Sequence, residues 1–126
     1  MKIALVSSKD SRLDVLSRVE KRLKSRISGV EVVVKTAHSN LDIPKTLLSL
    51  KGFNLIVVAL YYPAESVDVK VVMEKLVDLD LSGHETMKFI SPSEDADESE
   101  EAKKITKAIL QKFFGKKEIR SGSGRG

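Results

Sequence analysis

The feature that most constrains this chain is a run of six consecutive apolar residues, 55–60, between Asn54 and Tyr61. Successive side chains of a strand point to opposite faces, so a strand made of this run is apolar on both faces. Such strands lie in the middle of parallel sheets that helices cover on both sides. The run is far shorter than the roughly 20 residues that cross a membrane, so no membrane partner is expected.

Three further apolar segments have strand composition, and they alternate with segments of helical periodicity. In the first such segment, apolar residues recur at spacings of three and four, which is typical of one helix face. The alternation predicts an α/β fold with three layers, in which helices cover both faces of a four-stranded parallel sheet. The expected strands are residues 2–6, 30–35, 54–60 and 86–90, and the expected helices are residues 11–28, 42–51, 66–82 and 91–114.

Residues that favour helix ends mark these boundaries. Asp10 or Ser11 can cap the first expected helix, and Ser11 with Asp14 resembles a capping box. Asp42 with Pro44 resembles a capped helix start. We expect further starts at Ser66 and in the segment Ser91-Pro92-Ser93-Glu94, and helix ends near Gly29, Gly52, Gly83 and Gly115. Residues 1–115 then form a single α/β domain, and residues 116–126 form a basic tail rich in Gly and Ser.

The formal net charge of +4 comes from 22 Lys and Arg against 18 Asp and Glu. Most of it lies at the end of the chain, because residues 115–126 hold Lys116, Lys117, Arg120 and Arg125 against Glu118. The rest of the chain is close to neutral, so nucleic acid is a weakly supported partner. The absence of cysteine excludes disulfides, thiol catalysis and cysteine metal sites, and it fits a reducing cytoplasm.

Ligands of open parallel sheets bind at the carboxyl ends of the strands, which directs attention to the loops at residues 7–11, 36–41, 61–66 and 91–95. No Gly-x-Gly-x-x-Gly motif follows the first expected strand, because the first glycine of the chain is Gly29. A dinucleotide fingerprint and a P-loop are therefore excluded there. No histidine pair has metal-ligand spacing, so a protein zinc site is not expected.

Short motifs follow three of the expected strands in order: Ser11-Arg12-Leu13-Asp14, then Lys35-Thr36 with Asp42-Ile43-Pro44, then Tyr61-Tyr62-Pro63. Over residues 2–71 their order and spacing resemble the archaeal riboflavin synthase family, a relative of lumazine synthase. The resemblance implies a lumazine-synthase-like subunit with flavodoxin-like strand order, assembled as a homopentamer. It also implies the conversion of two 6,7-dimethyl-8-ribityllumazine molecules into riboflavin and a ribitylaminopyrimidine, with Mg²⁺, in sites between neighbouring subunits.

The candidate site residues come from the resemblance and from the loops. The resemblance implies catalytic roles for Arg12 and Asp14 and ligand contacts for Lys35, Thr36, Asp42, Pro44 and Pro63. From residue chemistry, His38 is a candidate general base, Ser8 a hydroxyl ligand, and Tyr61 or Tyr62 a stacking ring, of which only one can face the pocket. The chain departs from its relatives at Tyr61 and Ala64, where they carry glycines, and at Met73-Glu74, where they carry His-Glu.

Each candidate has a structural alternative. Asp14 and Asp42 suit helix starts, His38 suits an exposed loop, and the two tyrosines suit packing. The acidic segment 94–101 suits a solvated helix start better than a metal site. At the level of function, the alternatives are a non-catalytic lumazine-synthase-like scaffold that binds a flavin or lumazine, and a small basic module that binds nucleic acid through the first helix and the tail.

Overall fold

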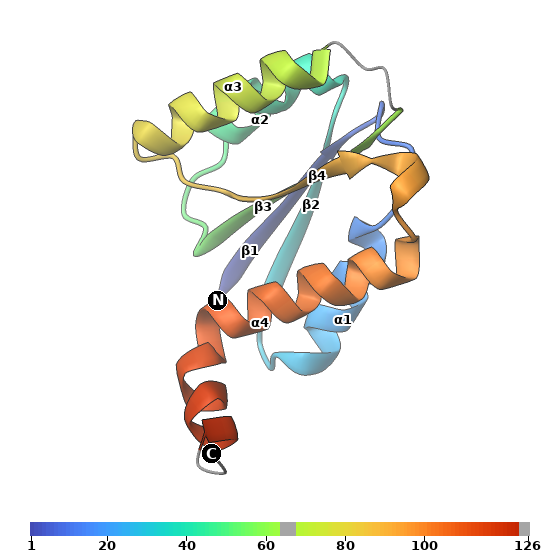
Figure 1. The fold of residues 1–126 in the computed structure, drawn as a ribbon. Coiled ribbons are helices and arrows are strands. Elements are labelled where there is room, and N and C mark those ends of the chain that lie inside the picture. The colour runs from blue at the N-terminus through green and yellow to red at the C-terminus, as the bar shows by residue number, and fades with distance from the viewer. Residues whose placement is uncertain (64–67, 124–126) are drawn as a thin grey trace.

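The structure is a computed structural model that describes residues 1–63 and 68–123, with side chains described up to residue 115. Its strands and helices alternate along the chain (Figure 1). In order they are β1 (Lys2–Ser8), α1 (Leu16–Arg26), β2 (Glu31–Ala37), a 3₁₀ turn (Asn40–Asp42), α2 (Ile43–Leu48), β3 (Leu55–Tyr62), α3 (Asp68–Leu81), β4 (Met87–Pro92), a second 3₁₀ turn (Ser93–Asp95) and α4 (Glu98–Ser123).

The four strands form one parallel sheet in the order β2-β1-β3-β4. This is the order of flavodoxin-like doubly wound sheets, in which the chain reverses direction across the sheet after the second strand. The α/β class and the all-parallel sheet predicted from the sequence are confirmed. Within the described residues, no helix has the length and apolar character needed to cross a membrane.

Helices cover both faces of the sheet (Figure 1). On the face of α1 and α4, Leu23 and Ile105 pack in a buried cluster with Val57 of β3. On the face of α2 and α3, Ile43 and Leu76 pack in a second cluster with Val58. Because β3 supplies buried side chains to both clusters, residues 55–60 form the two-faced central strand that their composition predicted.

The expected start of the first helix is wrong. α1 begins at Leu16, and Val15 occupies its N-cap position without a side-chain hydrogen bond. Ser11, one of the two expected caps, instead accepts a hydrogen bond from the backbone N–H of Tyr61 at 3.1 Å, and the backbone N–H of Arg12 donates to the carbonyl of Tyr61 at 2.7 Å. Asp10, the other expected cap, accepts the backbone N–H of Asn40. These contacts hold the segment against the end of β3 and delay the helix.

The start of α2 differs from the expected one only in its cap. A 3₁₀ turn precedes α2, so Asp42 stands at the N-cap without a side-chain cap hydrogen bond, and Pro44 lies in the first turn as expected. The expected start of the third helix at Ser66 lies outside the described residues.

Gly29 and Gly83 follow α1 and α3 with φ of 74° and 90°, a conformation that glycine adopts without strain.

Both expected ends of the last helix are wrong. Ser91 and Pro92 belong to β4, and the cap is Asp97, whose carboxylate accepts the backbone N–H of Glu100 at 3.0 Å. α4 also continues through Gly115 to Ser123, because a single glycine lowers helix stability without ending the helix. The separation of residues 116–126 as a basic tail remains a prediction, and residues 124–126 lie outside the described part of the chain.

Candidate functional site

A cavity of about 360 Å³ lies at the carboxyl ends of β1, β2 and β3, on the face of the sheet that α1 and α4 cover. The segment between β1 and α1 crosses its rim. The hydrogen bonds from this segment to Tyr61, and that of the backbone N–H of Lys9 to the carbonyl of Ala37 at 2.9 Å, fix the rim to β3 and β2. Its polar lining consists of Ser7, Ser8, Lys9, Ser11, Arg12, Asp14, Thr36, Tyr61 and Glu98.

Several of these polar side chains have no protein partner. Within the described part of the chain, the cations of Lys9 and Arg12 form no ion pair and no side-chain hydrogen bond. The hydroxyls of Ser7 and Thr36 form no hydrogen bond with another described residue. Cationic donors and hydroxyls in one cavity suit a ligand that is rich in oxygen atoms, such as a polyol with carbonyl groups.

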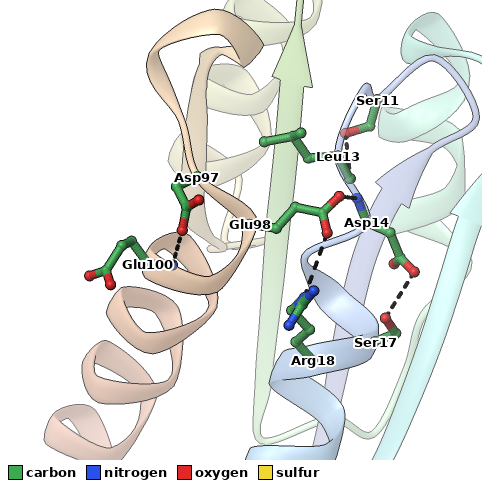
Figure 2. Close-up of polar contacts among 8 residues, drawn as sticks. All are labelled: Ser11, Leu13, Asp14, Ser17, Arg18, Asp97, Glu98 and Glu100. Atoms are coloured by element: carbon green, nitrogen blue, oxygen red, sulfur yellow. Dashed lines mark hydrogen bonds and ion pairs between the residues drawn. The ribbon is translucent and has the colours of Figure 1, made fainter.

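The carboxylates of the cavity are engaged with neighbouring groups (Figure 2). Asp14 accepts a hydrogen bond from Ser17 at 2.9 Å. Glu98, at the start of α4, accepts the backbone N–H of Asp14 at 3.1 Å and pairs with Arg18 at 3.6 Å. Glu98 therefore joins the starts of α1 and α4, a role hidden from sequence reasoning because 84 residues separate it from Asp14.

A buried polar network fixes the loops beneath the rim. Asn40 is only 2% exposed, and its side-chain oxygen accepts the hydroxyl of Ser8, itself 4% exposed, at 2.5 Å. The carboxylate of Asp10 accepts the backbone N–H of Asn40 at 2.9 Å, and the amide of Asn40 donates to Asp68 at 3.4 Å. The hydroxyl of Ser8 is therefore used to join the loops after β1 and β2. From the sequence, the amide of Asn40 is one of the loop groups suited to a ribityl chain, and its role in joining the loops depends on partners that are distant in the chain.

The two tyrosines at the end of β3 point to opposite faces of the sheet. Tyr61 is 1% exposed and lines the cavity, whereas Tyr62 packs on the face of α2 and α3. The hydroxyl of Tyr61 donates to Glu101 at 2.9 Å, and burial together with this carboxylate raises the pKa of Tyr61 far above its usual range. Stacking of a flat ligand on Tyr61 remains a prediction, and the ring is held in place by the core.

The other candidates lie away from the cavity. Lys35 alternates with Thr36 on the edge strand β2 and is exposed, and His38 is exposed in the loop after it. Asp42 accepts the hydroxyl of Ser39 at 3.1 Å. Pro63 lines an adjoining hollow that includes Asn40 and shares Arg12 with the cavity. One chain thus brings Ser8, Arg12, Asp14, Thr36 and Tyr61 together, while His38, Lys35, Asp42 and Pro63 lie outside the cavity.

No metal centre is evident in the described residues, where no three His, Cys, Asp or Glu side chains gather closely enough to hold an ion. The two carboxylates of the cavity, Asp14 and Glu98, are engaged with Ser17 and Arg18. The described residues of one chain therefore do not by themselves fit the magnesium ion that the resemblance implies.

Compared with known proteins, the chain matches no family model and no curated relative. Evidence about function therefore comes from the residues at the carboxyl edge of the sheet and from the resemblance in the order of their motifs.

Proposed function

We propose that this protein is a riboflavin-synthase-like transferase, acting on 6,7-dimethyl-8-ribityllumazine at the carboxyl edge of its sheet. The observation that supports this is the shared cavity of Arg12 and Thr36. Arg12 follows β1 and Thr36 lies near the end of β2, and the resemblance implies that both contact the ligand. The proposal includes a cytoplasmic location, which the absence of cysteine favours.

In this proposal, each part of the cavity meets one part of the substrate. Arg12 and Lys9 donate to the carbonyl oxygens of the pyrimidine ring, and the hydroxyls of Ser7 and Thr36 bind the ribityl chain. His38 and Lys35 are exposed at and beyond the edge strand β2, so we expect them to act in the site of a neighbouring subunit in a homopentamer.

Turnover is the direct test. The protein is incubated with 6,7-dimethyl-8-ribityllumazine, with Mg²⁺ or with EDTA, and riboflavin is detected by its fluorescence. Arg12→Gln should reduce turnover at least tenfold, since it removes a charged hydrogen-bond donor from the cavity. Arg26→Gln is the matched control, because Arg26 is exposed in the last turn of α1 and has no ion pair among the described residues. Absence of product from folded protein would reject the enzyme.

A second candidate is a non-catalytic scaffold that binds riboflavin or lumazine. The buried position of Tyr61 favours it, because this large side chain stands where members of the family that the chain resembles carry glycine, and Glu101 fixes it. Tight binding of riboflavin without turnover, weakened by Arg12→Gln and unchanged by Arg26→Gln, would support this candidate over the enzyme.

Nucleic-acid binding is the least supported of the alternatives. Two of the basic residues on α1 are already paired, Arg18 with Glu98 and Lys24 with Glu20 at 3.0 Å. If the tail and α1 did bind nucleic acid, the affinity would fall steeply with salt. Binding that is absent or independent of salt would remove this alternative.

A further inference from the structure

The segment that carries Arg12 is held from two sides. On the side of β3, the hydroxyl of Ser11 accepts the backbone N–H of Tyr61 at 3.1 Å, and the backbone N–H of Arg12 donates to the carbonyl of Tyr61 at 2.7 Å. On the side of α4, the carboxylate of Glu98 accepts the backbone N–H of Asp14 at 3.1 Å (Figure 2). Arg12 therefore lies between two anchors, one at the end of a strand and the other at the first residue of a helix.

The anchor on α4 matters because no regular structure fixes this part of the backbone. β1 ends at Ser8 and α1 begins at Leu16, so the residues between them belong to no helix or strand. Single contacts then decide where Arg12 lies relative to the cavity that it lines. Among the described residues, Glu98 provides the side-chain contact from α4 to this segment.

The two oxygens of Glu98 have different partners. Oε2 accepts the N–H of Asp14, whereas Oε1 lies 3.6 Å from Nε of Arg18, and the side chain of Glu98 is 35% exposed. Exposed hydrogen bonds and ion pairs compete with water, so their net contribution to the stability of a fold is small. Ligand binding depends more steeply on the position of the binding group, and a displacement of about 1 Å can be costly. Loss of the Glu98 anchor should therefore affect binding more than stability.

We propose that Glu98 is a positioning residue of the site at the carboxyl edge. By accepting the N–H of Asp14, it keeps Arg12 at the wall of the cavity, where Arg12 binds the substrate. The property that Glu98 supplies is a hydrogen-bond acceptor, and its ion pair with Arg18 is not needed for this role. The inference rests on the proposed function, because that function gives Arg12 its ligand.

The anchor can be tested without any ligand, from the NMR order parameters of the ¹⁵N-labelled full chain. In Glu98→Ala, the amide groups of Arg12 and Asp14 should fall from the rigid range of about 0.85 towards about 0.6. Glu98→Gln keeps an oxygen that accepts the N–H of Asp14, so it should stay close to the wild type. Unchanged order parameters in Glu98→Ala would overturn the inference, whether or not the proposed function is correct.

Glu100→Ala is the matched control for these measurements. Glu100 lies in the same first turn of α4, so both changes remove an acid that favours the start of this helix. Its side chain is 72% exposed, pairs with Lys103 at 3.5 Å and does not line the cavity. Glu100→Ala should leave the order parameters of Arg12 and Asp14 unchanged, and an effect as large as that of Glu98→Ala would contradict a specific anchor.

Binding of 6,7-dimethyl-8-ribityllumazine tests the consequence for the site. Glu98→Ala should weaken binding about threefold or more, whereas Glu98→Gln and Arg18→Gln should stay within about twofold of the wild type. Because Glu98 acts through Arg12, adding Glu98→Ala to Arg12→Gln should cause no further loss of affinity. Additive losses, or equal losses in Glu98→Ala and Glu98→Gln, would overturn the proposed role.

Urea denaturation separates this role from a purely structural one. Glu98→Ala should shift the urea midpoint no more than Glu100→Ala does, and a clearly larger decrease would assign Glu98 to the stability of the fold instead. Failure of the proposed function gives a different result, since the wild type would then not bind the ribityllumazine at all. In that case the order parameters of Glu98→Ala still show whether Glu98 anchors the segment.

Discussion

The two edges of the sheet differ in whether their buried polar groups are hydrogen-bonded. At the carboxyl edge, Asn40, Ser8 and Asp10 satisfy one another and fix the loops after β1 and β2. At the amino edge, Thr86 keeps an unpaired hydroxyl in a cavity wall. The carboxyl edge therefore combines a rigid frame with the unpaired cations of Lys9 and Arg12, which is the arrangement expected of a preorganised ligand site.

This difference has a physical origin in the order of the strands. Because β1 and β3 are adjacent and their crossovers run to opposite faces, the loops after them separate at the carboxyl edge and leave space for a ligand. The turns that lead from a helix back to the sheet, such as the one from α3 to β4, lie at the amino edge. Their main role is to reverse the direction of the chain.

The largest effect should come from breaking the carboxyl-edge network. Asn40→Ala removes a buried side chain that bonds Ser8 and Asp68, and we expect it to cost about 2–3 kcal/mol of unfolding free energy. Asn54→Ala at the amino edge is the matched change, since its exposed hydrogen bond to Lys2 should cost less than about 1 kcal/mol. Urea denaturation measures both, and equal losses would contradict the difference between the edges.

An intermediate effect is expected from Tyr61→Phe, which removes the buried hydrogen bond to Glu101 at the wall of the cavity. The loss should be about 1–2 kcal/mol near neutral pH, measured by urea denaturation. Tyr62→Phe is the control, because the hydroxyl of Tyr62 has no hydrogen-bond partner among the described residues and its ring packs on the other face of the sheet. A loss no larger than that of Tyr62→Phe would show that the bond to Glu101 contributes nothing.

The same residue predicts a dependence on alkaline pH. Burial and Glu101 raise the pKa of Tyr61, so its contribution to stability is complete below the pKa of about 10 of an unfolded tyrosine. Above pH 10 the unfolded chain ionises first, and the wild type should lose stability as the pH rises. The advantage of the wild type over Tyr61→Phe should therefore shrink between pH 10 and 12, and a constant difference would contradict the raised pKa.

The smallest effect is expected at the amino edge, from Asp80→Asn. Burial acts to raise the pKa of Asp80, but the hydrogen bonds from Lys88 and from the backbone of Thr86, with the charge of Lys88, lower it overall. The stability from this pair is present above the unfolded pKa near 3.9 and is lost as the pH falls below it. Asp80→Asn should cost up to about 1 kcal/mol at pH 7 and less at pH 3, in thermal or urea denaturation. A cost that stays equal at both pH values would exclude the ion pair as its cause.

Much of the fold could be predicted from the sequence, because hydrophobic patterns report local burial. The run 55–60 predicted a central strand, and β3 supplies both cores. The helix starts were harder to predict, because distant partners decide them. Ser11 would cap a helix in isolation, but Tyr61 binds it, and Asp97 caps α4 where Ser91 was expected.

For the site, the sequence predicted only which segments of the chain would line it. Arg12 follows β1 and Thr36 lies near the end of the neighbouring strand β2, so the parallel order brings both to the same edge of the sheet, where both line the cavity. The hydrogen bonds of Asn40 to Asp68, of Glu98 to Asp14 and of Glu101 to Tyr61 join residues that lie 28 to 84 positions apart in the chain, so no local pattern could identify them. The unpaired hydroxyl of Thr86 is equally invisible, because it depends on which groups the fold leaves beside it.

The most direct test of the central claim is to map where 6,7-dimethyl-8-ribityllumazine binds, using amide shifts of the ¹⁵N-labelled protein. We predict saturable shifts at Arg12 and Thr36 that Arg12→Gln weakens at least tenfold, with no comparable shifts at Thr86 and Met87. Shifts confined to the amino edge, or binding that Arg12→Gln leaves unchanged, would contradict the assignment of the ligand site to the carboxyl edge.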